Sequence, residues 1–250
     1  MNGKTGVLFG RLMRHILRSP DTIITVAITP IAIMLMFVYV FGGAITASLP
    51  SGVNYVNYQL PGILLMAINS GISYTAFRMF GDRQSGIFSR FHSMPIRRSS
   101  ALWAHVFVSL VSNMLTVAII FLVALPMGFR SSAGILEWLS VAGILALFTL
   151  ALTWVAVIPG LVAKSAEGAS VFSYPLIFLP MFSSAFAPTE TMPAAVRWFA
   201  ENQPITSIVE TLRSLLNAEP AGNEIWIALA WCAGIALVAY FFAMRAYGRA

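Results

Sequence analysis

The chain has 250 residues and a formal net charge of +6, and 58% of its residues are hydrophobic while only 10% are charged. A soluble domain carries about 25% charged residues, and a chain this short has too little core to bury so many long apolar segments. Composition therefore excludes a soluble protein. The basic residues gather at the ends of the apolar runs, which argues against nucleic acid as a partner.

The N-terminal residues 1–20 are predicted to form an amphipathic helix on the cytoplasmic membrane surface. Apolar residues recur there at helical spacing, while Arg11, Arg14 and Arg18 share another stripe that would face anionic lipid headgroups. Two interpretations stay open, namely a simple interfacial anchor and a lever that touches a cytoplasmic partner. Pro20 ends this helix.

Six apolar runs predict an all-α fold with six transmembrane helices in a single domain covering residues 1–250, because a bilayer crossing takes about 20 residues. The runs cover residues 22–47, 58–77, 101–129, 138–163, 169–187 and 225–244. The third run is longer than a bilayer requires, so its helix is expected to tilt or to end before Pro126. The fifth contains Pro175 and Pro180, which can bend a helix either as a flexing point or as a shaped packing element.

The distribution of Lys and Arg predicts that both termini are cytoplasmic, since basic residues concentrate on that side. With six spans, most basic residues fall on the side of the termini, and these are Lys4, Arg11, Arg14, Arg18, Arg78, Arg83, Arg90, Arg97, Arg98, Lys164, Arg245 and Arg249. The other side keeps Arg130, Arg197 and Arg213.

Polar residues at helical spacing on the second and third spans are candidates for lining a substrate path. They are Asn69, Ser73, His105, Ser109 and Asn113. Polar groups in hydrocarbon must find hydrogen-bond partners, so these stripes should face the bundle interior. Hydrogen bonding between helices is the alternative role of the stripes. His105 is the one ionisable residue well inside a span and is either functional or directed toward the interface.

No residue pattern points to catalysis in this chain. The three histidines are scattered, Cys232 lies in an apolar run, and no nucleophile–base pair or metal-ligand cluster is visible. We therefore expect no catalytic residue, no metal and no cofactor in this chain. No span carries Asp or Glu at its centre, which argues against coupling to protons or sodium ions.

Residues 188–224, between the last two spans, are predicted to form an outer segment with two short helices. One covers Met192–Ala200 and has Pro193 near its start, a usual first-turn position. The other covers Pro204–Leu216, has one apolar face, and places Glu210 and Arg213 close enough to pair.

The cytoplasmic loop at 78–100 contains the stretch GDRQSGIFSRFHSMPIRRSS, a charged island between two apolar runs. Phe88, Phe91 and Met94 recur at a spacing of three, which indicates either a partner surface or a helix lying on the membrane. Pro95 disfavours helix at the preceding residue and separates this segment from the third span.

Two motifs resemble those of type-2 ATP-binding-cassette (ABC) transporter permeases, most closely the daunorubicin-resistance type of drug exporter. The first is APTETMPAAVRWFAENQPITSIVETLR, in which the matching residues are Pro188, Met192, Pro193, Trp198, Pro204 and Arg213. The second lies in the cytoplasmic island, and its matching residues are Asp82, Arg83, Gly86, Arg90 and Pro95. Two departures from the family pattern are Gln203 directly before Pro204, where Asn is usual, and fewer acidic residues in the island.

The resemblance implies a permease subunit that works as a homodimer or heterodimer in the bacterial plasma (inner) membrane, with ABC ATPase subunits on its cytoplasmic face. ATP and magnesium would bind to the ATPase, and the exported substrate would be an amphiphilic drug, a lipid or a lipid-linked glycan. The island would act as a coupling helix through Asp82, Arg83, Gly86, Phe88, Arg90, Phe91, Met94 and Pro95. The alternatives are a secondary transporter or channel without an ATPase, and an intramembrane enzyme.

Overall fold

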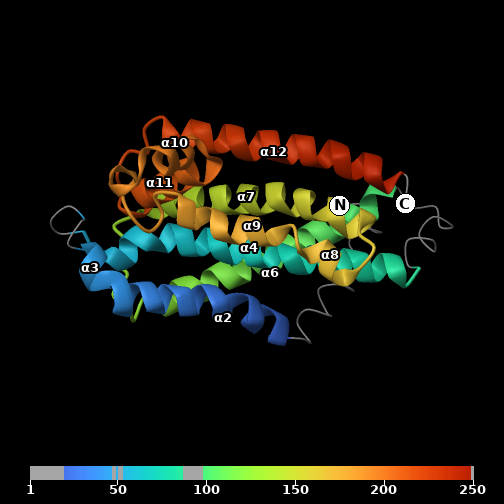
Figure 1. Cartoon of the computed structure of the whole chain (residues 1–250), viewed down its shortest axis with the longest axis horizontal. Helices are drawn as coiled ribbons and strands as arrows, with labels where there is room; N and C mark the ends of the chain where they lie inside the picture. The colour runs from blue at the N-terminus through green and yellow to red at the C-terminus, as the bar shows by residue number, and fades with distance from the viewer. Residues whose placement is uncertain (1–19, 47–48, 50–52, 87–97, 249–250) are drawn as a thin grey trace.

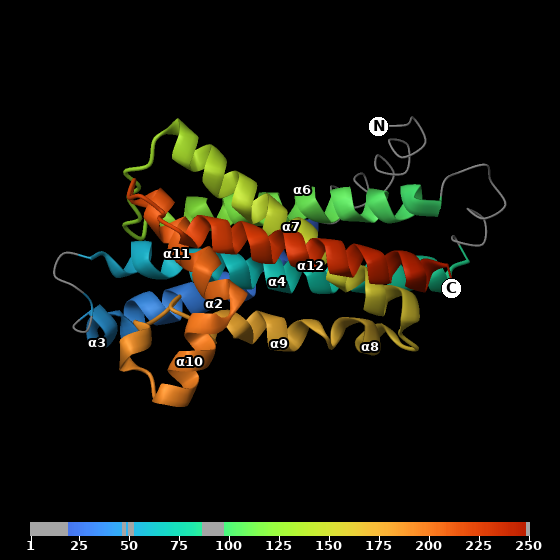
Figure 2. The ribbon, with the colours of Figure 1, turned by 90° about the horizontal axis from the view of Figure 1, so that it is seen from above.

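The computed structural model describes residues 20–46, 49, 53–86 and 98–248, and the regular secondary structure in these residues is all helical, as the composition predicts. Five helical segments are long and apolar enough to cross a membrane. They run side by side along the longest axis of the molecule (Figure 1, Figure 2). The predicted amphipathic helix at 1–20 lies outside the described residues except for Pro20.

The first long segment consists of α2 (Pro20–Met36), the π-helix η1 (Phe37–Phe41) and α3 (Gly42–Thr46) without interruption. The other four are α4 (Tyr55–Gln84), α6 (Arg98–Ala124), α7 (Ile135–Val162) and α12 (Glu224–Tyr247).

Helix α4 is the central element of the bundle. In its apolar 18-residue stretch 78% is buried, against 22% in α12 and in the segment 24–46. It contacts α2, α6, α7, α8, α9 and α11, and it contributes more buried residues to the main hydrophobic core than any other helix does. Because α2 and α12 each carry many exposed apolar side chains, lipid or a second membrane protein would cover these two helices.

Helix α4 extends seven residues beyond the predicted end of its span at Phe77. The sequence turns polar at Arg78, but the backbone remains helical to Gln84. A charged residue ends an apolar run without ending a helix, so α4 carries the beginning of the predicted coupling loop as a rigid extension. Helix α6, in contrast, ends two residues before Pro126.

The segment predicted as a fifth span, residues 169–187, is not confirmed as one membrane-crossing helix. It begins within α8 (Ala166–Ser170) and continues through α9 (Ser173–Phe178) and the 3-10 helix η2 (Leu179–Phe182), which lie alongside α4 (Figure 1, Figure 2). Pro175 and Pro180 each fall in the first turn of a new helix, where a backbone N–H has no intrahelical partner to lose. The run is therefore a series of short helices in which both prolines lie in first turns, whereas Pro30, Pro61 and Pro159 lie inside long helices.

The segment 188–224 forms η3 (Thr189–Thr191), α10 (Ala194–Asn202) and α11 (Pro204–Leu216) at one end of the bundle (Figure 1). Pro193 precedes α10 and Pro204 is the first residue of α11. The predicted apolar face of α11 is buried against the core, through Ile205, Ile208, Val209, Leu212 and Leu216. Neither helix is long enough to cross a bilayer, and this end of the bundle is closed by α11.

Candidate functional site

A close contact between two side chains links the end of α4 to the beginning of α6. Oδ2 of Asp82 lies 3.1 Å from Nε2 of His105, and the His105 side chain is almost fully buried. Arg78 lies one turn before Asp82 on α4, where side chains four residues apart are neighbours. The carboxylate of Asp82 thus connects the first turn of the predicted coupling loop with the third predicted span.

A buried cluster of hydroxyl groups joins α4, α6 and α7 further into the bundle. Thr75 donates a hydrogen bond to the hydroxyl of Ser109 (2.8 Å), whose oxygen also lies 3.1 Å from that of Thr153. Arg78 donates to Thr75 (3.3 Å), so this cluster continues from the charged end of α4. Ser109, predicted from its stripe on the third span, is therefore the centre of a contact between three helices.

Asn113 and Asn69 extend the polar surface along the bundle. The Asn113 amide donates to the backbone oxygen of Ser109 (2.9 Å), and its Oδ1 atom lies so close to Gly71 that a Cβ there would be 2.1 Å away. Asn69 donates to the carbonyl of Leu176 on α9 (2.6 Å). The side-chain oxygens of both asparagines are buried and have no hydrogen-bond partner among the described residues.

Replacing Ser109 with alanine is expected to lower the free energy of unfolding by about 1 kcal/mol, since interhelical hydrogen bonds in membranes contribute about 0.6 kcal/mol each. Ser112→Ala is the matched control on the same helix, because Ser112 bonds only to the carbonyl of Val108 in its own helix. Thermal unfolding of the purified chain measures both. Equal midpoints for the two variants would contradict a role of Ser109 in helix packing.

Ser73 differs from the other stripe residues because it borders a cavity. The cavity has a volume of about 430 Å³ and lies between α4 and the α8–α9 segment, where it is lined by Ser73, Tyr74, Phe77, Ser170 and Tyr174. Its walls combine aromatic faces with hydroxyl groups, and none of these lining residues carries a formal charge. Such a surface suits an amphiphilic molecule with a flat apolar part.

Arg213 connects three segments at the opposite end of the bundle. Its Nη2 atom donates to the carbonyls of Tyr58 on α4 (3.1 Å) and Ser184 after η2 (2.8 Å), while Nη1 lies 2.6 Å from a carboxylate oxygen of Glu210. The guanidinium also lies over the Tyr58 ring, 3.7 Å from its centroid, a favourable cation–π arrangement. The side chain is only 13% exposed, so this contact is shielded from water.

The other predicted residues of the outer motif shape the chain around this contact. Pro188 and Met192 flank η3, where the Met192 amide donates to the carbonyl of Thr189 (3.0 Å). The Pro193 carbonyl accepts from the amide of Arg197, and Pro204 begins α11. Trp198, in contrast, is 69% exposed, so it reaches outward from α10 and does not contribute to the core.

Gln203, which departs from the family pattern, has a structural role at the joint between α10 and α11. Its side chain is buried, and Nε2 donates to the carbonyl of Phe182 (2.8 Å). The amide therefore holds the joint against η2.

An exposed ion pair on α10 contrasts with the shielded contact of Arg213. Arg197 donates to a carboxylate oxygen of Glu201 (2.7 Å). This hydrogen bond lowers the pKa of Glu201 and raises the pKa of Arg197. Both side chains are nearly half exposed, and solvent screens such pairs.

Only part of the predicted coupling segment lies within the described residues. Asp82 and Arg83 belong to the last turn of α4, and Gly86 follows it with a φ of +68°, a conformation that favours glycine. Arg83 donates to the carbonyl of Ala163 after α7 (3.0 Å). The remaining predicted residues lie outside the described part, and they are Phe88, Arg90, Phe91, Met94 and Pro95.

Sequence reasoning missed several partners of the predicted residues. Thr153, which contacts Ser109, lies four residues after Thr149 on the fourth predicted span, so a search for polar stripes on that span would have found it. The carbonyls of Tyr58 and Ser184 have no such signal, because backbone acceptors leave no trace in the sequence. Within the described residues no group of His, Cys, Asp and Glu is arranged to hold a metal ion.

Comparison with known proteins covers most of the chain. Residues 4–217 match the family described as ABC-2 type transporter. The chain is 26% identical over 241 residues to the daunorubicin resistance ABC transporter permease protein of Streptomyces coeruleorubidus. The aligned region covers 95% of this chain and 83% of that protein. It is 25% identical over 232 residues to the doxorubicin resistance ABC transporter permease protein in two strains of Mycobacterium tuberculosis. Here the aligned region covers 91% of this chain and 82% of each relative. These findings confirm the resemblance that the two motifs indicate.

Proposed function

Because the chain belongs to the ABC-2 type transporter family, we propose that it is the membrane-spanning subunit of an exporter driven by ATP hydrolysis on a separate ABC ATPase. The match over residues 4–217 is the observation that carries this proposal. The chain itself performs no catalysis in this mechanism, and ATP and magnesium bind to the ATPase. The complex lies in a bacterial inner membrane and contains two permease subunits and two ATPase subunits.

The proposed topology has six crossings with both termini in the cytoplasm. The five long helices supply five crossings, and the α8–α9–η2 segment alongside α4 supplies the sixth. The bundle end where α4, α7 and α12 terminate holds Arg78, Arg83, Arg98, Lys164 and Arg245, while the end closed by α11 holds Arg130, Arg197 and Arg213. The excess of basic residues at the first end supports a cytoplasmic position for it.

Coupling to the ATPase enters through the loop between α4 and α6. Both helices that flank the loop belong to the buried bundle, and α4 is its central element. The Asp82–His105 contact joins the two sides of the loop, so a force applied to the loop acts on α4 and α6 together. The hydroxyl cluster around Ser109 links α6 to α7, so motion of α4 and α6 would also move α7.

The arrangement of carboxylates supports an ATPase as the energy source. In the described parts of the five long helices, Asp and Glu occur only within three residues of a helix end, and these residues are Asp21, Asp82, Glu137 and Glu224. Ion-coupled transporters use acidic groups inside the membrane to bind the coupling ion. This distribution disfavours a secondary transporter.

The proposed substrate is an amphiphile, with a drug as the favoured class and a lipid or lipid-linked glycan as the others. The two relatives are described as daunorubicin and doxorubicin resistance permeases. The cavity bordered by Ser73 offers the aromatic and hydroxyl surfaces that such a molecule would contact. Because this cavity lies between α4 and the α8–α9 segment, motion of α4 would change its shape.

Docking of the ATPase is tested with Phe88→Asp in the coupling loop. We expect recovery of the ABC ATPase that co-purifies with the chain to fall by about tenfold, since a charge at the centre of an apolar contact removes a dominant part of the binding energy. Phe199→Asp is the matched control, because Phe199 is an exposed aromatic residue on α10 at the opposite end. Affinity purification from membranes measures both variants.

Two outcomes would contradict the proposed function. One is equal ATPase recovery with Phe88→Asp and with the unmodified chain. The other is substrate transport by vesicles that contain the purified chain without any ATPase, which would favour the secondary transporter or channel.

A further inference from the structure

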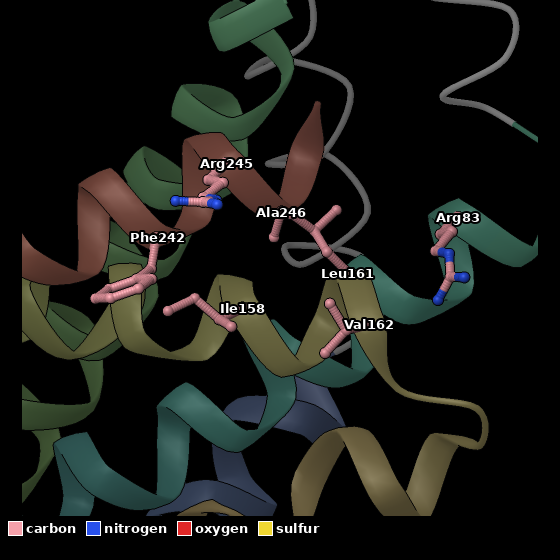
Figure 3. Close-up of a pocket in the computed structure, with 7 residues that line it drawn as sticks. All are labelled: Arg83, Ile158, Leu161, Val162, Phe242, Arg245 and Ala246. Carbon is pink, nitrogen blue, oxygen red and sulfur yellow. The ribbon is translucent and has the colours of Figure 1, made fainter. Parts of the chain in front are cut away.

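A second cavity lies at the bundle end where α4, α7 and α12 terminate (Figure 3). Its volume is about 500 Å³, and its wall is formed by Arg83 from α4, by Ile158, Leu161 and Val162 from α7, and by Phe242, Arg245 and Ala246 from α12. The cavity is distinct from the one bordered by Ser73, which lies between α4 and the α8–α9 segment. None of the residues in this wall other than Arg83 belongs to the predicted coupling or substrate residues.

The wall has two kinds of surface. Arg83 and Arg245 provide two guanidinium groups, and the remaining five residues are apolar. Arg83 uses Nη1 to bond the carbonyl of Ala163, whereas the Arg245 guanidinium forms no hydrogen bond or ion pair with any described residue. No acidic residue lines the cavity, so donors for an anion remain available next to an apolar surface.

The apolar surface of the cavity is continuous with the outside of the bundle. Val162 and Phe242 are both more than half exposed, and Phe241, Val238 and Leu237 continue this exposed apolar strip along α12. Figure 3 shows Arg83 and Arg245 on opposite sides of this wall, so a bound molecule could place its anionic headgroup along the basic rim and an alkyl chain along α12. A free inorganic anion would leave the apolar side uncovered.

We propose that this cavity binds the phosphate headgroup of one anionic phospholipid, with its acyl chains along α12. The position of the cavity in the cytoplasmic leaflet rests on the proposed topology. Basic pockets between transmembrane helices on the cytoplasmic side are suited to anionic headgroups. The carbonyl ends of α7 and α12 carry partial negative charge, so binding depends on both arginines outweighing these helix ends.

Native mass spectrometry of the full-length purified chain, without ATPase, tests this site with phosphatidylglycerol and phosphatidylethanolamine. The unmodified chain is expected to retain phosphatidylglycerol more tightly. Arg245→Gln should weaken this binding about fivefold, and Arg83→Gln combined with Arg245→Gln roughly 30-fold, because each basic residue near an anionic headgroup contributes a similar amount. Arg245→Lys keeps the charge and should bind as the unmodified chain does.

Arg197→Gln is the matched control at the opposite end of the bundle and should leave phosphatidylglycerol binding unchanged. Equal binding of the two lipids, or equal phosphatidylglycerol binding with and without Arg245, would overturn the proposal. So would displacement of the lipid by an equal concentration of inorganic phosphate, which would indicate a site for a free anion. Arg245→Gln alone decides the question if the double variant does not elute as a folded species. A negative result in this lipid-binding experiment would not contradict ATPase docking, because no ATPase is present in it.

Discussion

Replacing Gly160 with alanine is expected to lower the free energy of unfolding by about 1–3 kcal/mol, because the added methyl group overpacks the contact between α7 and α4. A Cβ atom at Gly160 would lie 2.7 Å from Met79 Cβ and 3.0 Å from the carbonyl oxygen of Ala76. The Ala76 carbonyl is backbone and cannot turn away, so the two helices must separate. Small residues at helix crossings allow such close approach in membranes.

Gly143→Ala is the matched control for this prediction. Gly143 lies on the same helix, and a Cβ there would meet no atom within 4 Å. Thermal unfolding in detergent should show a midpoint about 5 °C lower for Gly160→Ala and an unchanged or slightly higher midpoint for Gly143→Ala, since alanine favours helix over glycine. If both variants unfold at the same temperature, the close approach of α4 and α7 is not a determinant of stability.

The long helices of this fold can be predicted from the sequence, whereas contacts between them, such as the one at Gly160, cannot. Five of the six apolar runs correspond to long helices because hydrophobic length is a property of each segment alone. The run at 169–187 is also apolar but forms short helices, with Pro175 and Pro180 in first turns. A run of apolar residues therefore predicts a segment that can enter the membrane, but it does not specify whether that segment is one continuous helix.

The predicted sites show a similar division between local and long-range information. Glu210 and Arg213 are three residues apart on one helix, so the sequence predicts that they pair. In the structure Nη1 of Arg213 lies 2.6 Å from Oε1 of Glu210. The sequence indicates His105 as an ionisable residue in a span, but its partner Asp82 lies on another helix. That contact depends on the relative register of α4 and α6, which spacing within either helix cannot specify.

Arg213→Ala is expected to lower the free energy of unfolding by about 3 kcal/mol, the largest effect predicted for a single substitution in this chain. The guanidinium satisfies the carbonyls of Tyr58 and Ser184 and the carboxylate of Glu210 at a position that is 13% exposed. Its removal leaves these acceptors without the charged donor that joins α11 to α4 and to the chain after η2. Arg213→Lys should recover only part of the loss, because an ammonium lacks the planar fork that reaches both carbonyls.

The matched control is Arg197→Ala on α10, where the ion pair with Glu201 is exposed to solvent. Its thermal midpoint should stay at the value of the unmodified chain, while Arg213→Ala should unfold about 5–10 °C lower. Substrate transport and dimer assembly should also decrease with Arg213→Ala, whereas ATPase recovery should remain, because Arg213 lies at the end of the bundle opposite Asp82 and Arg83. Loss of ATPase binding with unchanged stability would contradict the proposed topology, since it would place Arg213 on the ATPase side of the membrane.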